Sequence, residues 1–246
     1  MPIFLERPRE LKRVVLKISG ECIRHERGFV VDYQSVTKIA TEIFKAKDNT
    51  HCQIAVVTGG FIDSALLENA GVSRQSADEV GIISTISASV LLASALARIA
   101  GNEKVRIASS PGIRGIAEEY NSHKTSHHLS SRRVVIIAGG TGNPRSSTDY
   151  AAVLRAFELS AEMVLKGTLV RGIMDKDPRS HDDPNLIDRL SYKEFLGNDY
   201  PLMDPPAVSE AMKENMPIRI FDIFKPGNLL EIIRNQNQDI GSLICS

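Results

Sequence analysis

The chain has 246 residues, with 30 Lys and Arg against 30 Asp and Glu, so its formal net charge is zero. This balance argues against a general nucleic-acid binder, which needs a basic face to displace counterions. The cysteines Cys22, Cys52 and Cys245 are odd in number and far apart, so neither a zinc site nor a disulfide framework is indicated. We therefore expect a reducing, cytoplasmic setting.

The first half of the chain alternates apolar strand-like runs with segments of helical spacing. In chain order we predict a strand over 13–19, a helix over 33–47, a strand over 53–57, a helix over 76–100, and strands over 105–108 and 134–138. The first two strands run into glycines, at Gly20 and at Gly59-Gly60.

Residues 80–97 form an uncharged run of 18 residues, which approaches the length of a membrane span. Several hydroxyl side chains dilute the run, and no basic cluster or aromatic belt flanks it. We interpret it as a helix buried in the core or at a subunit interface, not as a membrane segment. A helix that is apolar most of the way round needs cover on both sides, so we expect an oligomer.

The most distinctive stretch, GGTGNPRSSTD, covers residues 139–149. It follows a predicted strand and precedes a predicted helix over 150–161, and it combines three glycines, an Asn-Pro pair and four hydroxyls. A strand that ends in this way before a helix leaves backbone N–H groups unpaired, which suits an anion such as phosphate. We interpret the stretch as a ligand loop; the alternative is an ordinary Gly/Pro connection.

The second half continues the alternation of strands and helices. We predict a strand over 163–165, an acidic loop over 175–184, helices over 192–196 and 205–215, a strand over 218–223, a short helix from Pro226 and a strand over 242–244. Such alternation predicts an α/β fold, here a three-layer sandwich whose mostly parallel central sheet is covered by helices on both faces. We expect a single domain over 1–246, with lobes of about 1–150 and about 151–246.

Ligands of parallel sheets collect outside the carboxyl ends of the strands. Four strands end in glycine-containing turns, so these turns are expected to converge on one rim: Ser19-Gly20, Gly59-Gly60, 139–142 and Gly167-Thr168. Neither G-x-x-x-x-G-K-[ST] nor G-x-G-x-x-G occurs in the sequence, so a nucleotide would be bound without either common phosphate loop.

Two lysines stand at the ends of strands that lead into these turns. Lys17 precedes Ser19-Gly20, and Lys166 precedes Gly167-Thr168. Each lysine alone could form a structural ion pair, because a buried unpaired ammonium is costly. Two lysines at equivalent strand ends favour a shared polyphosphate, whose charge they would neutralise during phosphoryl transfer.

Several carboxylates are candidates to orient these lysines or to hold magnesium: Asp78, Asp149, Asp177 and Asp204. Structural alternatives are an N-cap role for Asp149 or Asp204 and a turn role for Asp177. A cluster of histidines, His123, His127 and His128, has i, i+4 spacing that a metal could use. No acidic or cysteine ligand stands beside it, so we expect a solvated loop and assign no metal ligand.

These residues together resemble bacterial uridylate kinases, members of the amino-acid kinase superfamily, over nearly the whole chain from about Arg13. The Thr-Gly-Asn-Pro element of 141–144, continuing to Thr148-Asp149, carries the most specific part of the resemblance. The further matching motifs are KISGE at 17–21, VTGG at 57–60, Ala77-Asp78, LKGT at 165–168, DKDP at 175–178, Met203-Asp204, PIRIF at 217–221 and KPGN at 225–228.

The resemblance implies transfer of the γ-phosphoryl group of ATP to UMP, with Mg²⁺, in pyrimidine nucleotide synthesis. It also implies a homohexamer with GTP and UTP as effectors, and no nucleic-acid or membrane partner. The implied catalytic residues are Lys17 and Lys166, which would stabilise the transferring group, and Asp204, which would position a lysine or the magnesium ion. The implied ATP-binding residues are Lys17, Ile18, Ser19, Gly20, Thr168, Met174 and Asp177. The implied UMP-binding residues are Gly59, Gly60, Asp78 (for the ribose), Thr141, Gly142, Asn143, Pro144, Arg145, Ser146, Ser147 and Thr148.

The sequence also departs from the family pattern near the phosphates. Phe61, Ile62 and Ala65 replace the usual third glycine, asparagine and later arginine. Arg171 replaces an aspartate, and Arg145-Ser146 replaces an aromatic pair. Two alternatives therefore stay open: a nucleotide-binding oligomer with weak or lost kinase activity, and a superfamily kinase with another small acceptor. We hypothesise that Arg145 partly replaces the missing arginine charge.

Overall fold

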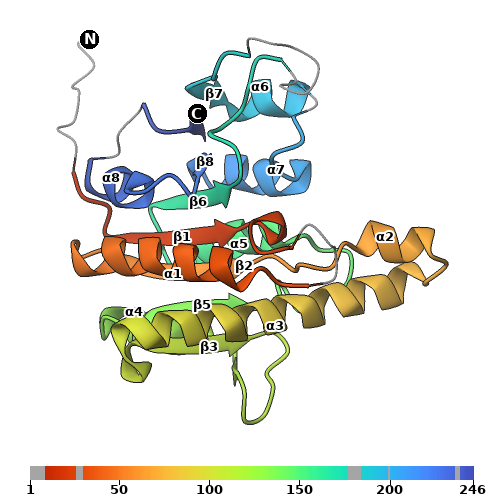
Figure 1. Ribbon diagram of the computed structural model, residues 1–246. Coiled ribbons are helices and arrows are strands. Elements are labelled where there is room, and N and C mark those ends of the chain that lie inside the picture. Colours follow the sequence, from red (N-terminus) through yellow and green to blue (C-terminus); the bar gives the residue numbers. More distant parts are fainter. Residues whose placement is uncertain (1–8, 26–29, 177–183, 199, 236–238) are drawn as a thin grey trace.

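The computed structural model describes residues 9–25, 30–176, 184–198, 200–235 and 239–246. Within these residues one nine-stranded sheet has the order β4-β3-β5-β2-β1-β6-β8-β9-β7 (Figure 1). Its strands are β1 (Arg13–Ile18), β2 (Gln53–Thr58), β3 (Val105–Ser109), β4 (Glu118–Glu119), β5 (Val134–Ala138), β6 (Met163–Thr168), β7 (Arg189–Ser191), β8 (Ile218–Asp222) and β9 (Ser242–Cys245). Only the β8–β9 pairing is antiparallel among the described strands, which confirms the mostly parallel sheet.

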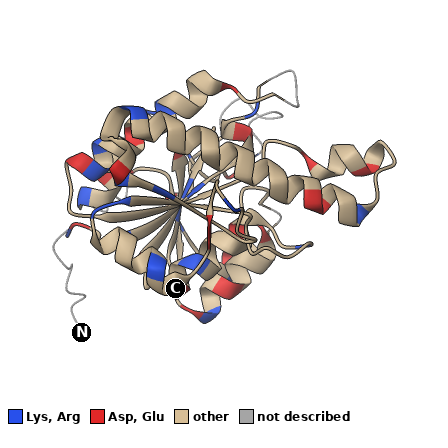
Figure 2. Cartoon of the chain, turned by 90° about the horizontal axis from the view of Figure 1, so that it is seen from below, with Lys and Arg blue, Asp and Glu red and all other residues tan. Residues whose placement is uncertain are grey.

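Helices cover both faces of the sheet, as predicted (Figure 2). They are α1 (Tyr33–Asp48), α2 (Ser64–Asn69), α3 (Arg74–Ala100), α4 (Ser122–Ser130), α5 (Thr148–Glu158), α6 (Tyr192–Gly197), α7 (Pro205–Lys213) and α8 (Asn228–Asn235). Apolar residues of α1, α3 and α8 form one core with the sheet. Those of α4, α5, α6 and α7 form the other.

Successive side chains of a strand point to opposite faces of the sheet, and β1 shows this plainly. Val14, Leu16 and Ile18 belong to the core under α1, α3 and α8. Val15 belongs to the core under α5 and α7. Lys17 therefore shares the face of Val15 and points toward α5.

The structure corrects several sequence predictions. The histidine cluster lies on helix α4 and not in a loop; this short helix is capped by the Asn121 side chain and buries only Thr125 and Leu129, which explains its weak periodicity. Helix α2 was not predicted; none of its residues is buried, so its sequence has no apolar stripe that would indicate a helix. Strands β4 and β7, of two and three residues, were too short to predict. Helix α3 begins two residues earlier than expected, at Arg74, because Ser73 caps it.

Helix α3 is long and apolar enough to cross a membrane by length and composition, but half of its most apolar window is buried inside the fold. Its buried side packs on α1 and on the sheet. On its other side Ile83 and Val90, seven positions apart, remain exposed in the single chain. The helix is thus partly a core element, and an apolar strip of it faces outward.

Candidate active site at the carboxyl edge of the sheet

The four glycine-containing strand ends converge on one rim, as predicted. Strands β5, β2, β1 and β6 are neighbours in this order and run parallel, so their carboxyl ends lie at the same edge. The turns after β1 and β2 touch backbone to backbone: a Cβ on Gly20 would lie 1.8 Å from the carbonyl oxygen of Gly60. A Cβ on Gly59 would lie 2.5 Å from the nitrogen of Gly20. Side chains at these positions would force the two turns apart.

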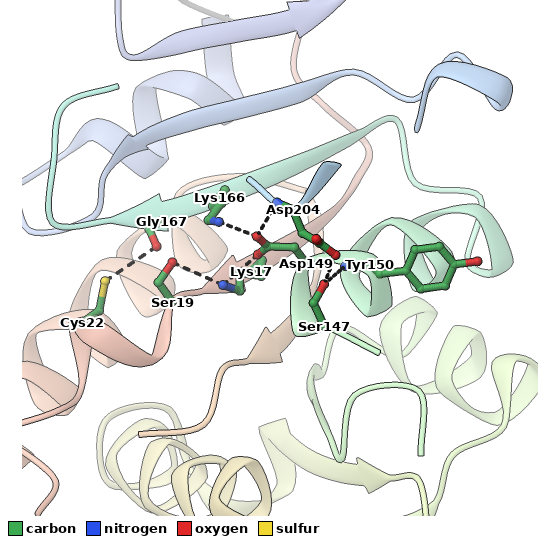
Figure 3. A network of polar contacts seen from close by, with 9 residues as sticks. All are labelled: Lys17, Ser19, Cys22, Ser147, Asp149, Tyr150, Lys166, Gly167 and Asp204. Atoms are coloured by element: carbon green, nitrogen blue, oxygen red, sulfur yellow. Dashed lines mark hydrogen bonds and ion pairs between the residues drawn. The ribbon is translucent and has the colours of Figure 1, made fainter. Parts of the chain in front are cut away.

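Lys17 and Lys166 meet at this rim around one carboxylate (Figure 3). The Nζ of Lys17 lies 2.8 Å from Oδ1 of Asp149, and the Nζ of Lys166 lies 2.6 Å from Oδ2. All three residues are buried, with exposed fractions of 5%, 6% and 8%. The two lysines therefore share one counter-ion in a dry setting.

The local fold explains why these three residues meet. Lys17 and Lys166 are register partners on the adjacent parallel strands β1 and β6. Two residues earlier on each strand, Val15 and Val164 lie in the core beneath α5, so the two lysines face the same helix. Asp149 lies in the first turn of α5, so its side chain faces both strands.

The charges of this cluster shift the ionisation of its members. Burial alone would raise the pKa of Asp149, but the positive charges of Lys17 and Lys166 outweigh burial and hold that pKa well below its usual range. Burial, together with the positive charge of Lys17, lowers the pKa of Lys166 to about 8, although Asp149 opposes the shift. With one carboxylate between two ammonium groups, the cluster keeps a surplus positive charge at neutral pH.

Asp204 and Ser147 extend this cluster toward solvent (Figure 3). The backbone N–H of Asp204 donates to Oδ2 of Asp149 over 3.2 Å. The hydroxyl of Ser147 donates to Oδ2 of Asp204 over 2.6 Å and accepts from the N–H of Tyr150 over 3.0 Å. Ser147 is thus the N-cap of α5, and the alternative interpretation of Asp149 as that cap is wrong. Asp204 occupies the N-cap position of α7 without a side-chain cap bond, so its carboxylate is left for the site.

A cleft of about 660 Å³ opens beside the cluster. Its wall contains many of the residues predicted for the phosphoryl acceptor: Gly60, Asp78, Asn143, Pro144, Arg145, Ser146, Ser147 and Thr148, together with Asp204. Gly59, Thr141 and Gly142 adjoin these residues in the chain and do not line the cleft themselves. The structure adds Arg74, Thr85 and Gly140, which the sequence prediction of the site missed.

Helix α3 fixes the loop over 139–148 at two points. Oδ2 of Asp78 accepts the backbone N–H of Arg145 over 3.0 Å, and Oγ1 of Thr85 accepts the N–H of Gly139 over 2.7 Å. Arg74 approaches the other oxygen of Asp78, with Nε 3.8 Å from Oδ1. Arg145 has φ of 63°, a value uncommon outside glycine, and the bond to Asp78 stabilises this backbone conformation.

Most residues that depart from the family pattern line this cleft or are chain neighbours of residues that line it, whereas Arg171 follows β6 and its Nη2 donates to the carbonyl oxygen of Pro184 over 3.5 Å. Phe61 packs against the core, and Ile62 lines the cleft. Ala65 lies in the first turn of α2, where its N–H donates to the capping carboxylate of Asp63. Arg145 and Ile62 both line the cleft, and so does Ser64, the neighbour of Ala65 in the chain.

The residues expected on the ATP side stand around the ends of β1 and β6. Lys17 donates to Oγ of Ser19 over 3.3 Å, while the side chain of Ile18 is buried in the core, so only its backbone can serve a ligand. The hydroxyl of Thr168 donates to the carbonyl of Val170 over 2.8 Å. Met174 forms an isolated bridge with Leu186, and Asp177 lies outside the described residues.

A second cavity, of about 860 Å³, opens next to these strand ends. Its lining includes Glu21 and Cys22 after β1, Leu169 after β6, and Phe224 and Pro226 after β8. Burial raises the pKa of the Cys22 thiol to about 12, so this cysteine is not a nucleophile at neutral pH. The rim thus borders two cavities, one lined by the loop over 139–148 and one lined by residues that follow β1, β6 and β8.

Comparisons with known proteins agree with this geometry. Residues 12–222 match the family described as the amino acid kinase family. A uridylate kinase of Coxiella burnetii is 38% identical over 235 residues, which cover 95% of each chain, and one of Wolinella succinogenes is 40% identical over 92% of this chain and 93% of its own. A solved UMP kinase structure from Bacillus anthracis has a TM-score of 0.89 at 30% identity, covering 96% of this chain and 97% of that one. The chain therefore belongs to the amino acid kinase family and, within it, to the uridylate kinases.

Proposed function

We propose that this protein transfers the γ-phosphoryl group of ATP to UMP, giving ADP and UDP. The observation that carries the proposal is the pair of buried ammonium groups, Lys17 and Lys166, held by one carboxylate at the edge of a parallel sheet. The names of the relatives support the same reaction, since uridylate kinases cover almost the whole chain.

Phosphoryl transfer needs positioning and charge stabilisation more than covalent chemistry from the protein. The surplus positive charge on Lys17 and Lys166 would stabilise the charge that builds up on the transferring group. Asp149 keeps both ammonium groups in place, because each of its oxygens binds one of them. The protein needs no general base to deprotonate the acceptor, because the phosphate of UMP is already an anion at neutral pH.

The cleft over 139–148 is the proposed UMP site. The N-terminus of α5, which begins within this loop, would supply backbone N–H groups to the phosphate of UMP. Asp78 is proposed for the ribose, although it already holds the loop through the N–H of Arg145. Residues 17–20 and Thr168, Met174 and Asp177 are proposed for ATP.

Magnesium would be held mainly by the ATP phosphates, as Mg²⁺ binds one or two carboxylates together with phosphates and water. Among the described residues no group of three or more His, Cys, Asp or Glu side chains forms a protein-only metal site. Asp204 could supply the single carboxylate that a phosphate-bound Mg²⁺ needs, because it lines the cleft and makes no ion pair within the described part of the chain. There Mg²⁺ would neutralise phosphate charge while Asp204 and the lysines orient the nucleotide.

We further propose a cytoplasmic homohexamer that responds to GTP and UTP. The outward strip of α3, with Ile83 61% exposed, supports assembly because a second copy would cover it. Analytical ultracentrifugation of the full chain tests the assembly: six copies support it, and a monomer at micromolar concentration contradicts it.

The reaction is tested by incubating the purified protein with Mg-ATP and each nucleoside monophosphate while ADP is followed. UDP formation with UMP supports the proposal. Tight binding of ATP and UMP without turnover would indicate a nucleotide-binding oligomer instead. Turnover only with an unrelated acceptor would indicate a kinase of another specificity.

A further inference from the structure

Helix α3 forms one wall of the proposed UMP cleft through a single stripe of residues. The residues of α3 that line the cleft are Arg74, Asp78, Gly81, Ile82 and Thr85. Their spacing of three or four residues, with Ile82 beside Gly81, places them on one face of the helix. At about 1.5 Å per residue the stripe extends about 16 Å along the helix axis. The helix begins well beyond the carboxyl ends of the strands (Figure 1), so the stripe leads outward from the edge of the sheet.

Two hydrogen bonds fix the order of residues along this stripe. At its inner end Thr85 accepts the N–H of Gly139, which directly follows β5. Further out, Asp78 accepts the N–H of Arg145. Arg74 lies one helical turn beyond Asp78 and is the outermost residue of the stripe.

The position of the lysine pair sets the direction of an acceptor in the cleft. For transfer, the phosphate of UMP has to meet the γ-phosphoryl group at the edge of the sheet. Ser147 and Asp204 line the cleft and connect it to Asp149, which holds both lysines. The phosphate therefore occupies the inner end, the ribose lies outward at Asp78, and the base lies outward of the ribose. The base thus reaches the level of Arg74.

The guanidinium of Arg74 has donors to offer at this level. Its Nε lies 3.3 Å from Oε1 of Glu68 on α2 and 3.8 Å from Oδ1 of Asp78, and the side chain is 65% exposed. These carboxylates attract and orient the guanidinium. Its N–H groups make no hydrogen bond within the part of the chain that the structure describes. They are therefore available to a ligand in the cleft.

The stability of α3 does not account for an arginine at this position. Ser73 is the N-cap, so Arg74 is the first helical residue and lies at the positive end of the helix dipole. A cation is unfavourable there, where an acidic residue would stabilise the helix. The ion pair with Glu68 is exposed and contributes little. A contact with a ligand gives the guanidinium a function that the helix itself does not need.

A guanidinium carries only hydrogen-bond donors, so it selects a base by its acceptors. Uracil, like thymine, has the carbonyl oxygen O4 at the position where cytosine has an amino group, which is a donor. A guanidinium that faces this edge therefore binds uracil and is left opposite another donor when cytosine takes its place.

We propose that Arg74 is a specificity-determining residue of the acceptor site, whose guanidinium donates to O4 of the uracil base. The proposal rests on the assignment of the cleft to UMP. Glu68 and Asp78 hold the guanidinium toward the outer end of the cleft, and the ribose and the phosphate are bound further in.

The test compares three ligands that differ only in the base: UMP, CMP and ribose 5-phosphate, which has no base. Their dissociation constants are measured by isothermal titration calorimetry for the full chain and for Arg74→Ala. Glu68→Gln removes an orienting charge without changing the cleft lining. Arg98→Ala, at an exposed arginine in the last turn of the same helix, is the matched control.

We expect Arg74→Ala to weaken the binding of UMP by about tenfold or more, the loss expected for a hydrogen bond from a charged group. Ribose 5-phosphate should bind as it does to the parent, and CMP should bind no less tightly. Glu68→Gln should give a smaller shift for UMP, and Arg98→Ala none. Thermal unfolding of Arg74→Ala should match the parent's, since the helix loses no favourable charge.

Other results would overturn the proposal. Equal weakening of UMP and ribose 5-phosphate would place Arg74 at the phosphate or the ribose. Equal weakening of UMP and CMP, or unchanged binding of UMP, would exclude a contact with O4.

Binding is measured without turnover, so this result is independent of the reaction. A parent that binds UMP with the expected dependence on Arg74 but forms no UDP would refute the proposed kinase function and leave the base contact established. A parent that forms UDP, with an unchanged preference for UMP over CMP in Arg74→Ala, would refute the base contact alone. A parent that does not bind UMP would contradict both.

Discussion

The Nζ of Lys166 lies 2.6 Å from Oδ2 of Asp149, although Lys166 projects from a central strand and Asp149 from the first turn of a helix above it. Because the second oxygen of Asp149 binds Lys17, the carboxylate serves two cations and satisfies neither fully. The site therefore keeps a net positive charge that attracts anions, whereas a single lysine–aspartate pair would be neutral. The consequences can be tested on several levels.

Replacement of Asp149 by asparagine should destabilise the protein strongly. It leaves two ammonium groups buried without a counter-ion, and breaking a buried pair in this way costs about 3–5 kcal/mol. Urea unfolding at pH 7 measures the loss. Lys17→Met is the control, because it leaves a neutral Lys166–Asp149 pair and should cost less stability while still abolishing transfer. An Asp149→Asn variant as stable as the parent would show that the lysines have another counter-charge.

The pH dependence of kcat/KM for ATP should show an alkaline decline centred near pH 8. Burial and the charge of Lys17 lower the pKa of Lys166 to about 8, so the ammonium form is present below this pH and is lost above it. The substrate phosphates, with a pKa near 6, stay ionised throughout this range. Lys166→Arg should keep its charge and remove the decline, whatever its absolute rate. A profile in that variant that matches the parent's would assign the decline to another group.

Ser147→Ala should lower both stability and kcat. The serine caps α5 and also holds Asp204, so its loss costs about 1 kcal/mol as a cap and frees the carboxylate. Ser191→Ala is a matched control, since Ser191 caps α6 in a capping box outside the cleft lining. Thermal unfolding and steady-state kinetics should show similar stability losses for the two variants and a fall in kcat only for Ser147→Ala. Equal kcat values would remove the link between the cap and catalysis.

Gly60→Ala should impair UMP binding. The added methyl group would meet Oγ of Ser84 and lie 3.0 Å from the carbonyl of Gly81, so Ser84 must give up its bond to that carbonyl or the turn must move away from α3. We expect the KM for UMP to rise by at least about tenfold, as small displacements in a binding site are costly. Gly197→Ala, where no atom lies within 4 Å of the new methyl group, should leave kinetics unchanged. A normal KM for Gly60→Ala would show that the turn adapts freely.

Arg145→Ala tests whether this side chain replaces the arginine that is missing at Ala65. Arg145 lines the cleft, and Ala65 directly follows Ser64, which also lines it. The loss of a charge-assisted contact costs about 1.5–3 kcal/mol, so we expect kcat/KM for UMP to fall by about tenfold or more. Lys193→Ala, an exposed cation on α6, controls for the general loss of positive charge. An unchanged kcat/KM for both substrates would exclude the compensating role.

The sequence predicted the strands that build the site because each is a short apolar run that ends in a distinctive turn. The meeting of the four glycine turns followed from parallel topology, which places all carboxyl ends at one edge. The segments missed were those with little buried surface. Helix α2 buries no residue, and α4 buries only Thr125 and Leu129, so neither has a readable apolar stripe.

The central role of Asp149 was harder to predict from the sequence. It was considered as a partner of the lysines, but its place in a loop-to-helix junction equally suited an N-cap. Only the structure shows that Ser147 makes the cap and that α5 lies over β1 and β6. The place of Arg74 in the cleft is similarly invisible in sequence, because α3 and the loop over 139–148 come together only in the fold.

The most direct test of the account is transfer of label from [γ-³²P]ATP to UMP by the intact protein and by Lys17→Met and Lys166→Met. The account predicts labelled UDP from the parent and a fall of at least about a hundredfold in both variants, with UMP binding retained, because each lysine stabilises the transferring group. Transfer at the parental rate by either variant, or no labelled UDP from a folded parent that binds both nucleotides, would contradict it.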